Sequence, residues 1–192
     1  HGEHSVVTEY KYYNGYYDRD KKDFYGFETV TTINVDGTWQ EDTYYNREYY
    51  SKGSLRESVA YDNENFVLSK SITTLCESPY PLPEKEESWI YEKATGENQY
   101  IYTYIEYEYD GYGNCTQLIQ GFADGEKLIG RISYDNDNTT DYIIGLPTQI
   151  CVYDKDDNLL RKREGSYNKY GELTALRQFF TKTDYSVNTI TY

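Results

Sequence analysis

Apolar and polar side chains alternate along much of the chain, and this alternation is its strongest structural signal. In residues 99–110, QYIYTYIEYEYD, one face carries Ile101, Thr103, Ile105, Tyr107 and Tyr109. The other face carries Tyr100, Tyr102, Tyr104, Glu106 and Glu108. A sustained period of two is typical of a β-strand. The same pattern predicts strands at Thr29–Val35, Thr38–Tyr45, Leu55–Tyr61, Phe66–Leu75, Glu87–Glu92, Cys115–Phe122, Lys127–Tyr134, Thr148–Tyr153, Leu159–Tyr167 and Leu173–Thr181.

Asp-Gly pairs and a proline-rich stretch predict where these strands are separated. VDGT, Val35–Thr38, and the Asp124–Gly125 pair of ADGEK are expected to form two-residue hairpin turns. The segment Cys76–Ser88, CESPYPLPEKEES, holds three of the four prolines and a run of acids. Because proline cannot donate to a strand ladder, this segment is predicted to be a loop or crossover between two groups of strands.

A Tyr-Asp motif of the form Y-[DN]-x-x-[GN] recurs at irregular intervals. Four copies begin at Tyr61, Tyr109, Tyr134 and Tyr167, and a looser copy at Tyr153 has its asparagine one place late. The candidate turn residues are Tyr61, Asp62, Asn65, Tyr109, Asp110, Gly113, Asn114, Tyr134, Asp135, Asn138, Tyr153, Asp154, Tyr167, Asn168 and Gly171.

The residue types of this motif are those of a tight turn. Asp or Asn at the first position of a type I turn can accept a hydrogen bond from a backbone N–H two residues on, and Gly or Asn three residues later tolerates a positive φ. Six residues after the motif tyrosines come Val67, Cys115, Leu159 and Leu173, and only Thr140 departs. The motif therefore predicts a strand–turn–strand unit whose second strand begins with a buried side chain.

Composition supports an all-β fold. The 192 residues include 26 tyrosines, and the apolar fraction of 38% is too high for a disordered chain. Tyrosine and β-branched residues favour strands. We expect residues 1–192 to form a single β-sheet region. The chain contains no methionine, and its final residues, NTITY, end as a strand in mid-pattern. We therefore expect a fragment of a larger protein.

The charge of the chain excludes several classes of partner. A formal net charge of −14 disfavours nucleic acid and anionic membrane surfaces, since both attract cationic proteins. The cluster formed by Lys155, Arg161, Lys162 and Arg163 is interpreted as a solvated strand face. No apolar run approaches the length of a membrane span, so no membrane insertion by this segment is expected.

Residues able to carry catalysis or bind metal are sparse. The only histidines are His1 and His4, which makes a Ser-His or Cys-His arrangement improbable. Cys76, Cys115 and Cys151 lack metal-ligand spacing and are expected to be buried free thiols. Asp135–Asp141 lacks the glycine and glutamate of a calcium loop, which favours a solvated turn. We predict no catalytic residue, no cofactor and no metal.

Several motifs together resemble a known family. YEYDGYGNCTQLIQ, residues 107–120, is similar to the repeat unit of the Rhs, or YD-repeat, family, which includes the shell-forming subunits of bacterial Tc-type insecticidal toxin complexes. NGYYDRDKKDFYGFETV, residues 14–30, resembles a more specific segment of the Tc-toxin shell proteins. Further landmarks follow in the same order at Tyr44–Leu55, Ile143–Ile150 and Leu159–Phe179.

The resemblance implies a fold and a function. Such repeats wind into a curved antiparallel sheet, a segment of a β-spiral shell that encloses a C-terminal polypeptide payload until delivery. The expected partners are the rest of the parent polypeptide and this payload, and the expected localisation is secreted or at the cell surface of a bacterium. The self-cleaving module of the family uses Asp-Pro signatures, and this chain contains no Asp-Pro. The resemblance therefore transfers no catalytic residue.

Two other classes of function remain open at this point. The tyrosine-rich sheet face could make the chain a cell-surface module that recognises glycans or a partner protein, because each tyrosine offers an apolar ring and a hydroxyl. An enzyme on a β-scaffold would require a deep pocket with convergent carboxylates whose pKa values are shifted.

Overall fold

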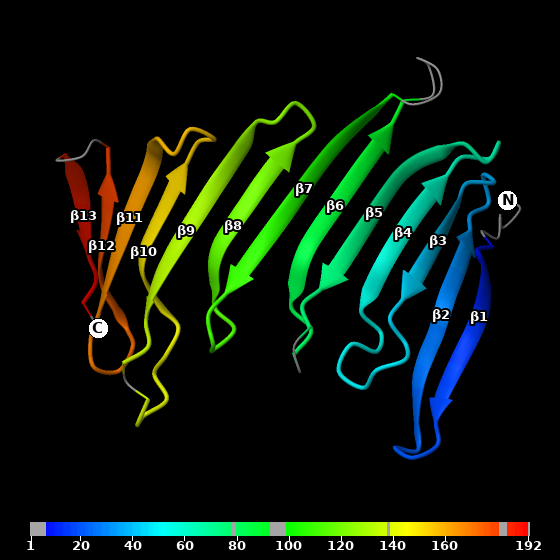
Figure 1. Cartoon of the computed structure of the whole chain (residues 1–192), viewed down its shortest axis with the longest axis horizontal. Coiled ribbons are helices and arrows are strands. Elements are labelled where there is room, and N and C mark those ends of the chain that lie inside the picture. The colour runs from blue at the N-terminus through cyan, green and yellow to red at the C-terminus, as the bar shows by residue number, and fades with distance from the viewer. Residues whose placement is uncertain (1–6, 78–79, 93–98, 138, 181–183, 192) are drawn as a thin grey trace, which may run out of the picture. The chain divides into compact units, whose positions relative to one another are not determined.

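The chain folds as an antiparallel meander of β-strands. This computed structural model describes residues 7–77, 80–92, 99–137, 139–180 and 184–191. The strands are β1 (Glu9–Asp18), β2 (Asp23–Ile33), β3 (Trp39–Tyr44), β4 (Leu55–Tyr61), β5 (Val67–Leu75), β6 (Pro83–Tyr91), β7 (Tyr100–Tyr109), β8 (Cys115–Phe122), β9 (Lys127–Asp135), β10 (Leu146–Tyr153), β11 (Leu159–Tyr167), β12 (Leu173–Phe179) and β13 (Tyr185–Thr189) (Figure 1). No helix long and apolar enough to cross a membrane occurs among the described residues.

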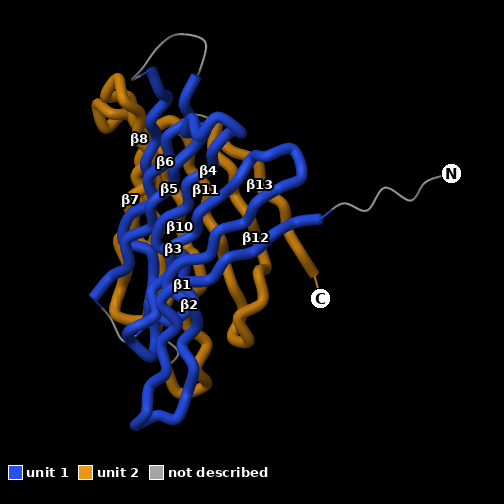
Figure 2. The backbone as a smooth tube through the Cα atoms, turned by 90° about the vertical axis from the view of Figure 1, so that its right-hand side faces the viewer, with its two compact units in different colours: residues 1–104 blue, residues 105–192 orange. Residues whose placement is uncertain are grey.

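The strands follow one another in the sheet in the order of the sequence, from β1 to β13. The chain divides into two compact units, His1–Tyr104 and Ile105–Tyr192, whose boundary falls within β7 (Figure 2). Within each unit the paired neighbours run antiparallel, as at β1–β2 and β8–β9. The predicted all-β antiparallel fold is confirmed.

Sequence periodicity located most of these strands. Three of them, Leu55–Tyr61, Cys115–Phe122 and Leu159–Tyr167, have the predicted bounds. Strand β1 was missed because tyrosines occupy both of its faces and Asn14 interrupts the pattern with a φ of 54°. The register also shifts between Tyr16 and Tyr17, which obscures the alternation further.

Of the loop or crossover predicted at Cys76–Ser88, the structure has a loop that ends before Pro83, and the crossover alternative is incorrect. Strand β6 begins at Pro83 and pairs antiparallel with β5, from Ser69↔Ile90 to Leu75↔Pro83, so the connection is a hairpin loop between sheet neighbours. Proline is tolerated here because the first residue of a strand can lack a ladder donor. Pro83 therefore marks the entry to a strand and does not separate two groups of strands.

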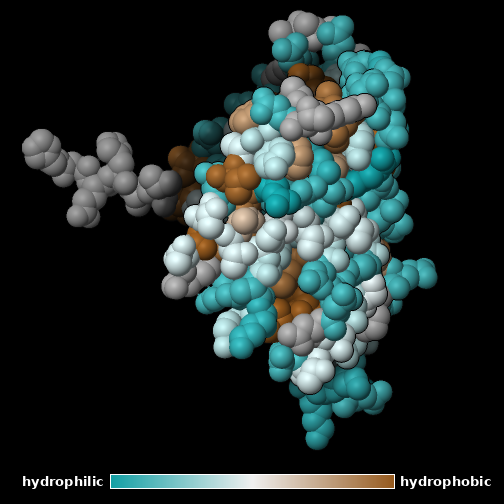
Figure 3. All heavy atoms as spheres, turned by 90° about the vertical axis from the view of Figure 1, so that its left-hand side faces the viewer, coloured by the Kyte–Doolittle hydropathy of each residue, from teal (hydrophilic) through white to brown (hydrophobic). Residues whose placement is uncertain are grey.

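Each unit has a thin core, because the substantial contacts between strands are all between sheet neighbours. The buried apolar residues among those described are Tyr25, Ile129 and Cys151. Many large apolar side chains lie at the surface among polar ones (Figure 3). The expectation that each hairpin re-enters with a buried side chain is wrong: Leu159 is 42% exposed, and Val67 is half-buried.

Candidate functional site: the Tyr-Asp turns and a tyrosine groove

Four copies of the Tyr-Asp motif form the same hairpin turn. At residues 62–66, 110–114, 154–158 and 168–172, the N–H of the first residue donates to the carbonyl of the fifth over 2.9–3.0 Å. The N–H of the fourth residue donates to the carbonyl of the first over 3.0–3.2 Å. This is a three-residue loop, in which a type I turn is followed by a left-handed residue. The left-handed residues are Asn65, Gly113, Asp157 and Gly171, with φ of 67°, 86°, 63° and 80°.

The first side chain of each turn holds the loop from inside. Oδ1 of Asp110 accepts the backbone N–H groups of Tyr112 and Asn114, each over 2.9 Å, and Oδ2 accepts the Asn114 amide over 3.0 Å. Burial opposes ionisation of Asp110, but these hydrogen bonds outweigh it and lower the pKa of its carboxyl. Asn168 accepts two backbone N–H groups in the same positions, from Tyr170 and Glu172.

The copy at Tyr153 has the same geometry as the copy at Tyr109. Asp157 takes the left-handed position, and Asn158 donates its backbone and side-chain N–H groups to Asp154 over 2.8 and 3.0 Å. Aspartate tolerates the left-handed region, so the late asparagine does not change the turn. Arg131 approaches from β9: its guanidinium lies 2.8 Å from the Asp157 carboxylate and 4.6 Å from the centre of the Tyr153 ring.

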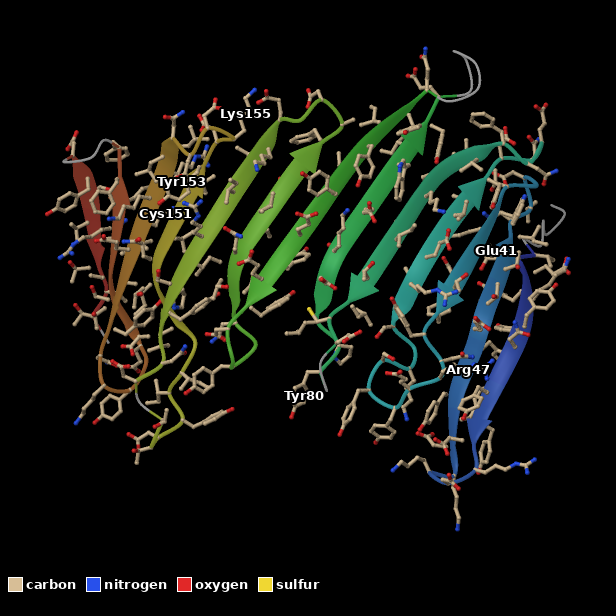
Figure 4. All side chains as sticks on the ribbon, viewed as in Figure 1. Glu41, Arg47, Tyr80, Cys151, Tyr153 and Lys155 are labelled. Atoms are coloured by element: carbon tan, nitrogen blue, oxygen red, sulfur yellow. The ribbon has the colours of Figure 1, made fainter. Side chains whose placement is uncertain are left out.

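The turn between β8 and β9 contacts the turn that follows Tyr153. Lys155, in the turn between β10 and β11, forms an ion pair with Glu126 in the turn between β8 and β9. A hydrogen bond with Cys151 and burial raise the pKa of the Tyr153 phenol. Figure 4 shows Cys151, Tyr153 and Lys155 in this part of unit 2. The ion pair between Lys155 and Glu126 joins the β8–β9 hairpin to the β10–β11 hairpin.

The copy at Tyr134 is different. Asp135 lies within β9 and pairs with Leu146, so residues 136–145 form a longer connection, and Asn138 lies outside the described residues. Asn136 donates to Oδ2 of Asp110 over 3.1 Å and accepts the N–H of Gly145 over 2.7 Å. The side chain of Asn136 therefore links this connection to the preceding Tyr-Asp turn.

The motif tyrosines contact neighbouring strands. The hydroxyl of Tyr134 donates to the Cys115 carbonyl over 2.9 Å, and that of Tyr167 donates to the Pro147 carbonyl over 3.0 Å. The ring of Tyr61 stacks on Trp39 with 3.8 Å between centroids. In these three copies the motif tyrosine thus also contacts the adjacent strand.

A register shift accompanies the motif tyrosine. It falls between Ala60 and Tyr61, between Val152 and Tyr153, and between Ser166 and Tyr167. Each of these tyrosines then pairs with the residue six places later: Tyr61↔Val67, Tyr153↔Leu159 and Tyr167↔Leu173. The six-residue spacing therefore reports cross-strand pairing and not burial, which is why its apolar residues remain partly exposed.

The two Asp-Gly turns have this geometry as well, so their prediction as two-residue turns is incorrect. In the loop 34–38, the N–H of Asn34 donates to the carbonyl of Thr38, and the N–H of Gly37 donates to the carbonyl of Asn34. The loop 122–126 has the same two hydrogen bonds at the corresponding residues. Positive φ occurs only at Gly37, 84°, and Gly125, 85°. A two-residue type I′ turn requires positive φ at both central residues, and the aspartates do not adopt it.

A second feature, missed from the sequence, is the loop 45–54 between β3 and β4. Asn46, 2% exposed, donates its amide to the carbonyls of Asn14 over 2.9 Å and Gly26 over 3.4 Å. Lys52 forms an ion pair with Asp23 and lies 4.6 Å from the centre of the Tyr25 ring. The loop is thereby anchored onto the β1–β2 hairpin. Its signal in the sequence was the pair of double tyrosines in YYNREYYSKG.

Tyr25 is the buried centre of this arrangement, at 4% exposure. Its hydroxyl donates to Oδ2 of Asp18 over 2.9 Å. Burial and this hydrogen bond raise the pKa of Tyr25 to about 12. Backbone donation from Lys21 and the Tyr25 hydroxyl lower the pKa of the Asp18 carboxyl. Tyr25 therefore remains a neutral hydrogen-bond donor throughout the physiological pH range.

The loop and the sheet enclose a groove of about 820 Å³ in unit 1. Its lining includes Tyr25, Tyr49, Tyr50, Arg47, Arg56 and Glu28. Arg47 and Arg56 each lie 3.9 Å from a Glu28 carboxylate oxygen, which is beyond hydrogen-bond distance. Arg47 lies over the Tyr16 ring, and Arg56 lies near that of Tyr45. Figure 4 shows Arg47 and Tyr80 at the same end of the strands of this unit.

The cysteines and acidic residues were the remaining candidates for a reactive or metal-binding site. All three cysteines are free thiols: Cys151 is buried, whereas Cys76 and Cys115 are only half-buried, so the expectation of burial holds for one of them. Burial raises the pKa of the Cys115 thiol. Within the described part of the chain, no group of three or more His, Cys, Asp or Glu side chains is placed to hold a metal ion.

The fold and the turns define a protein built from consecutive Tyr-Asp hairpins in an antiparallel sheet. Residues 1–58 match the family model described as the insecticide toxin TcdB middle/N-terminal region. No curated protein sequence matches the chain.

Solved structures of Tc toxins have a similar fold. The crystal structure of TcdB2-TccC3 matches with a TM-score of 0.65 and 11% identity, over 90% of this chain and 15% of the other. The Photorhabdus luminescens Tc holotoxin pore matches with a TM-score of 0.66 and 10% identity, with the same coverage. TcdB2-TccC3 without its hypervariable C-terminal region gives 0.66, 11% identity and the same coverage. The resemblance to Tc-toxin shell proteins is confirmed, and the chain spans about 15% of the length of these structures.

Proposed function

We propose that the chain is a non-enzymatic structural segment of a toxin-type shell that encapsulates and helps deliver a C-terminal polypeptide payload. The observation that carries this proposal is the match of residues 1–58 to the TcdB middle/N-terminal family, together with the fold shared with TcdB2-TccC3. Its partners are the remainder of its parent polypeptide and the payload. As part of a bacterial toxin it is secreted.

The mechanism is containment. Residues 1–192 act as one structural region in which hydrogen-bonded strands form a wall. The Tyr-Asp turns have a structural role: they set where each strand reverses and, through contacts such as Asn136 to Asp110, join adjacent hairpins. A wall of this kind encloses a chain by steric exclusion and needs no catalytic group.

Protease protection tests this function. The parent polypeptide that carries this chain is purified with its C-terminal segment and treated with protease under native conditions. We expect the C-terminal segment to survive far longer than the same segment expressed alone, because the wall excludes the protease. Equal rates of cleavage in the two samples would contradict encapsulation. Asp110→Ala in the same polypeptide should shorten the protection, whereas Asp137→Ala, in an exposed loop, should leave it unchanged.

A further inference from the structure

The groove in unit 1 has features that the wall function does not use. Tyr49, Tyr50 and Tyr80 are 50%, 61% and 72% exposed, although a tyrosine ring gains stability from burial. The ring centroids are 5.2 Å apart for Tyr49 and Tyr50, and 6.3 Å apart for Tyr50 and Tyr80. Tyr49 and Tyr50 line the groove, and Tyr80 lies beside Tyr50, so a row of exposed rings begins in the groove and continues next to it.

Two rings of the row, Tyr49 and Tyr50, lie on a loop that is held in place before any ligand binds. The loop 45–54 is fixed by the buried Asn46 amide and by Lys52, which lies 4.2 Å from the centre of the Tyr49 ring. Backbone hydrogen bonds from Tyr45 to Ser54 and from Gly53 to Tyr45, of 3.0 and 2.8 Å, close the base of the loop. A preorganised surface loses little conformational entropy on binding, which favours recognition of a small ligand.

The polar residues of the groove include two arginines, Arg47 and Arg56. Within the described part of the chain, neither Arg47 nor Arg56 donates a hydrogen bond to protein, and their side chains are 60% and 44% exposed. Glu28 supplies one negative charge against two guanidinium groups. The pair therefore keeps a positive charge and N–H donors in the planar arrangement that suits a carboxylate.

The acidic residues that line the groove limit how much negative charge a ligand can carry. Asp18 also lines the groove, but its oxygens already accept hydrogen bonds from Asp20, Lys21 and Tyr25. Glu48 and Glu77 line it too, and the whole chain carries −14. A polyanion is repelled by these charges, whereas a ligand with a single carboxylate fits the arginine pair. The remaining surface of the ligand must combine an apolar face with hydroxyl groups to match the tyrosines.

We propose that this groove binds an oligosaccharide that carries one carboxylate, such as a sialylated glycan. The carboxylate contacts Arg47 and Arg56, and the apolar faces of the sugar rings pack on Tyr49, Tyr50 and Tyr80. The tyrosine hydroxyls donate and accept hydrogen bonds with the sugar hydroxyls. A groove of about 820 Å³ lies within the range of small-molecule sites, about 300–1,000 Å³.

Calorimetric titration of the 192-residue chain with sialyllactose and with lactose tests this site. We expect sialyllactose to bind at least about tenfold more tightly, which corresponds to about 1.4 kcal/mol. Arg47→Gln and Arg56→Gln should remove this preference for the carboxylate. Tyr80→Ala, at an exposed position, should weaken the binding of sialyllactose without altering the melting temperature.

Matched controls separate the site from the general surface. Arg163→Gln changes an exposed arginine of unit 2, and Tyr170→Ala removes an exposed ring there, so both variants should bind like the wild type. Equal affinity for sialyllactose and lactose, or unchanged binding by both arginine variants, would overturn the proposal. Binding of an acidic peptide in place of the sugar, with dependence on Arg47, would also overturn it. None of these outcomes depends on the payload. The binding experiment therefore tests the glycan site independently of the proposed shell function.

Discussion

At the residue scale, the fourth position of each Tyr-Asp turn determines whether the hairpin closes. Gly113 has a φ of 86°, whereas Gly111, two residues earlier in the same turn, does not have a positive φ and has open space around it. The two glycines therefore differ in backbone conformation. This difference isolates the contribution of the left-handed residue.

Gly113→Ala should destabilise the chain by about 1 kcal/mol, because a side chain in the left-handed region is strained. Gly111→Ala should leave the stability within about 0.5 kcal/mol of the wild type or raise it slightly, since it restricts only the unfolded chain. Chemical denaturation of the two variants measures the difference. Equal stabilities would show that the conformation of Gly113 does not contribute.

Asp110 should make the stability depend on pH. Its pKa is lower in the folded state than in the unfolded chain, so its contribution is fully present above the unfolded value of about 3.9 and is lost as the pH falls through the folded value. The free energy of unfolding should therefore decrease in this acidic range. Asp110→Asn should make the decrease smaller in denaturation curves measured from pH 6 downward, and an unaltered pH profile would contradict this role.

At the element scale, hairpins are joined to their neighbours by single side chains. Asn46 fixes the loop 45–54 to the β1–β2 hairpin, and Asn136 connects the loop after β9 to the turn after β7. Both residues are asparagines, whose amide can donate and accept at the same time. The loops are consequently positioned by specific hydrogen bonds more than by apolar burial.

Asn46→Ala should cost about 1–3 kcal/mol, because it removes both hydrogen bonds that the buried Asn46 amide donates, to the carbonyls of Asn14 and Gly26. Amide hydrogen exchange at Gly53 and Tyr45 should accelerate as the loop loosens, since their hydrogen bonds close its base. Asn63→Ala, at an exposed turn position, serves as the control and should change neither measurement. Slow exchange at Gly53 in Asn46→Ala would show that the loop is held by other contacts.

At the scale of the whole molecule, the strand order ends at β1 and β13, and among the described residues each of these has one sheet neighbour. Edge strands present backbone donors and acceptors to other chains. Tyr10, Tyr12 and Val187 on these strands are also exposed. The 192-residue chain by itself should therefore associate in solution, with a mass by light scattering that rises with concentration. A concentration-independent monomer would contradict this expectation.

The sequence by itself determined the class of fold and most strand positions. Period-two alternation and the Tyr-Asp spacing are local properties, and both depend on contacts within one hairpin, such as Tyr167↔Leu173. The family landmarks at residues 14–30 and 44–55 were also readable from the sequence, because they are contiguous. The same landmarks meet in the structure, where Asn46 contacts Asn14 and Gly26.

Only the tertiary structure decided which surfaces are buried and which side chains from distant segments meet. The spacing of the Tyr-Asp motif predicted a buried side chain at Leu159. Among the described residues, no second layer covers the strands within either unit, so that side chain remains exposed. The groove could not be read from the sequence because Tyr25, Arg47, Arg56 and Leu75 come from separate strands and loops. Their proximity depends on sheet register and on the anchored loop, which are long-range properties of the fold.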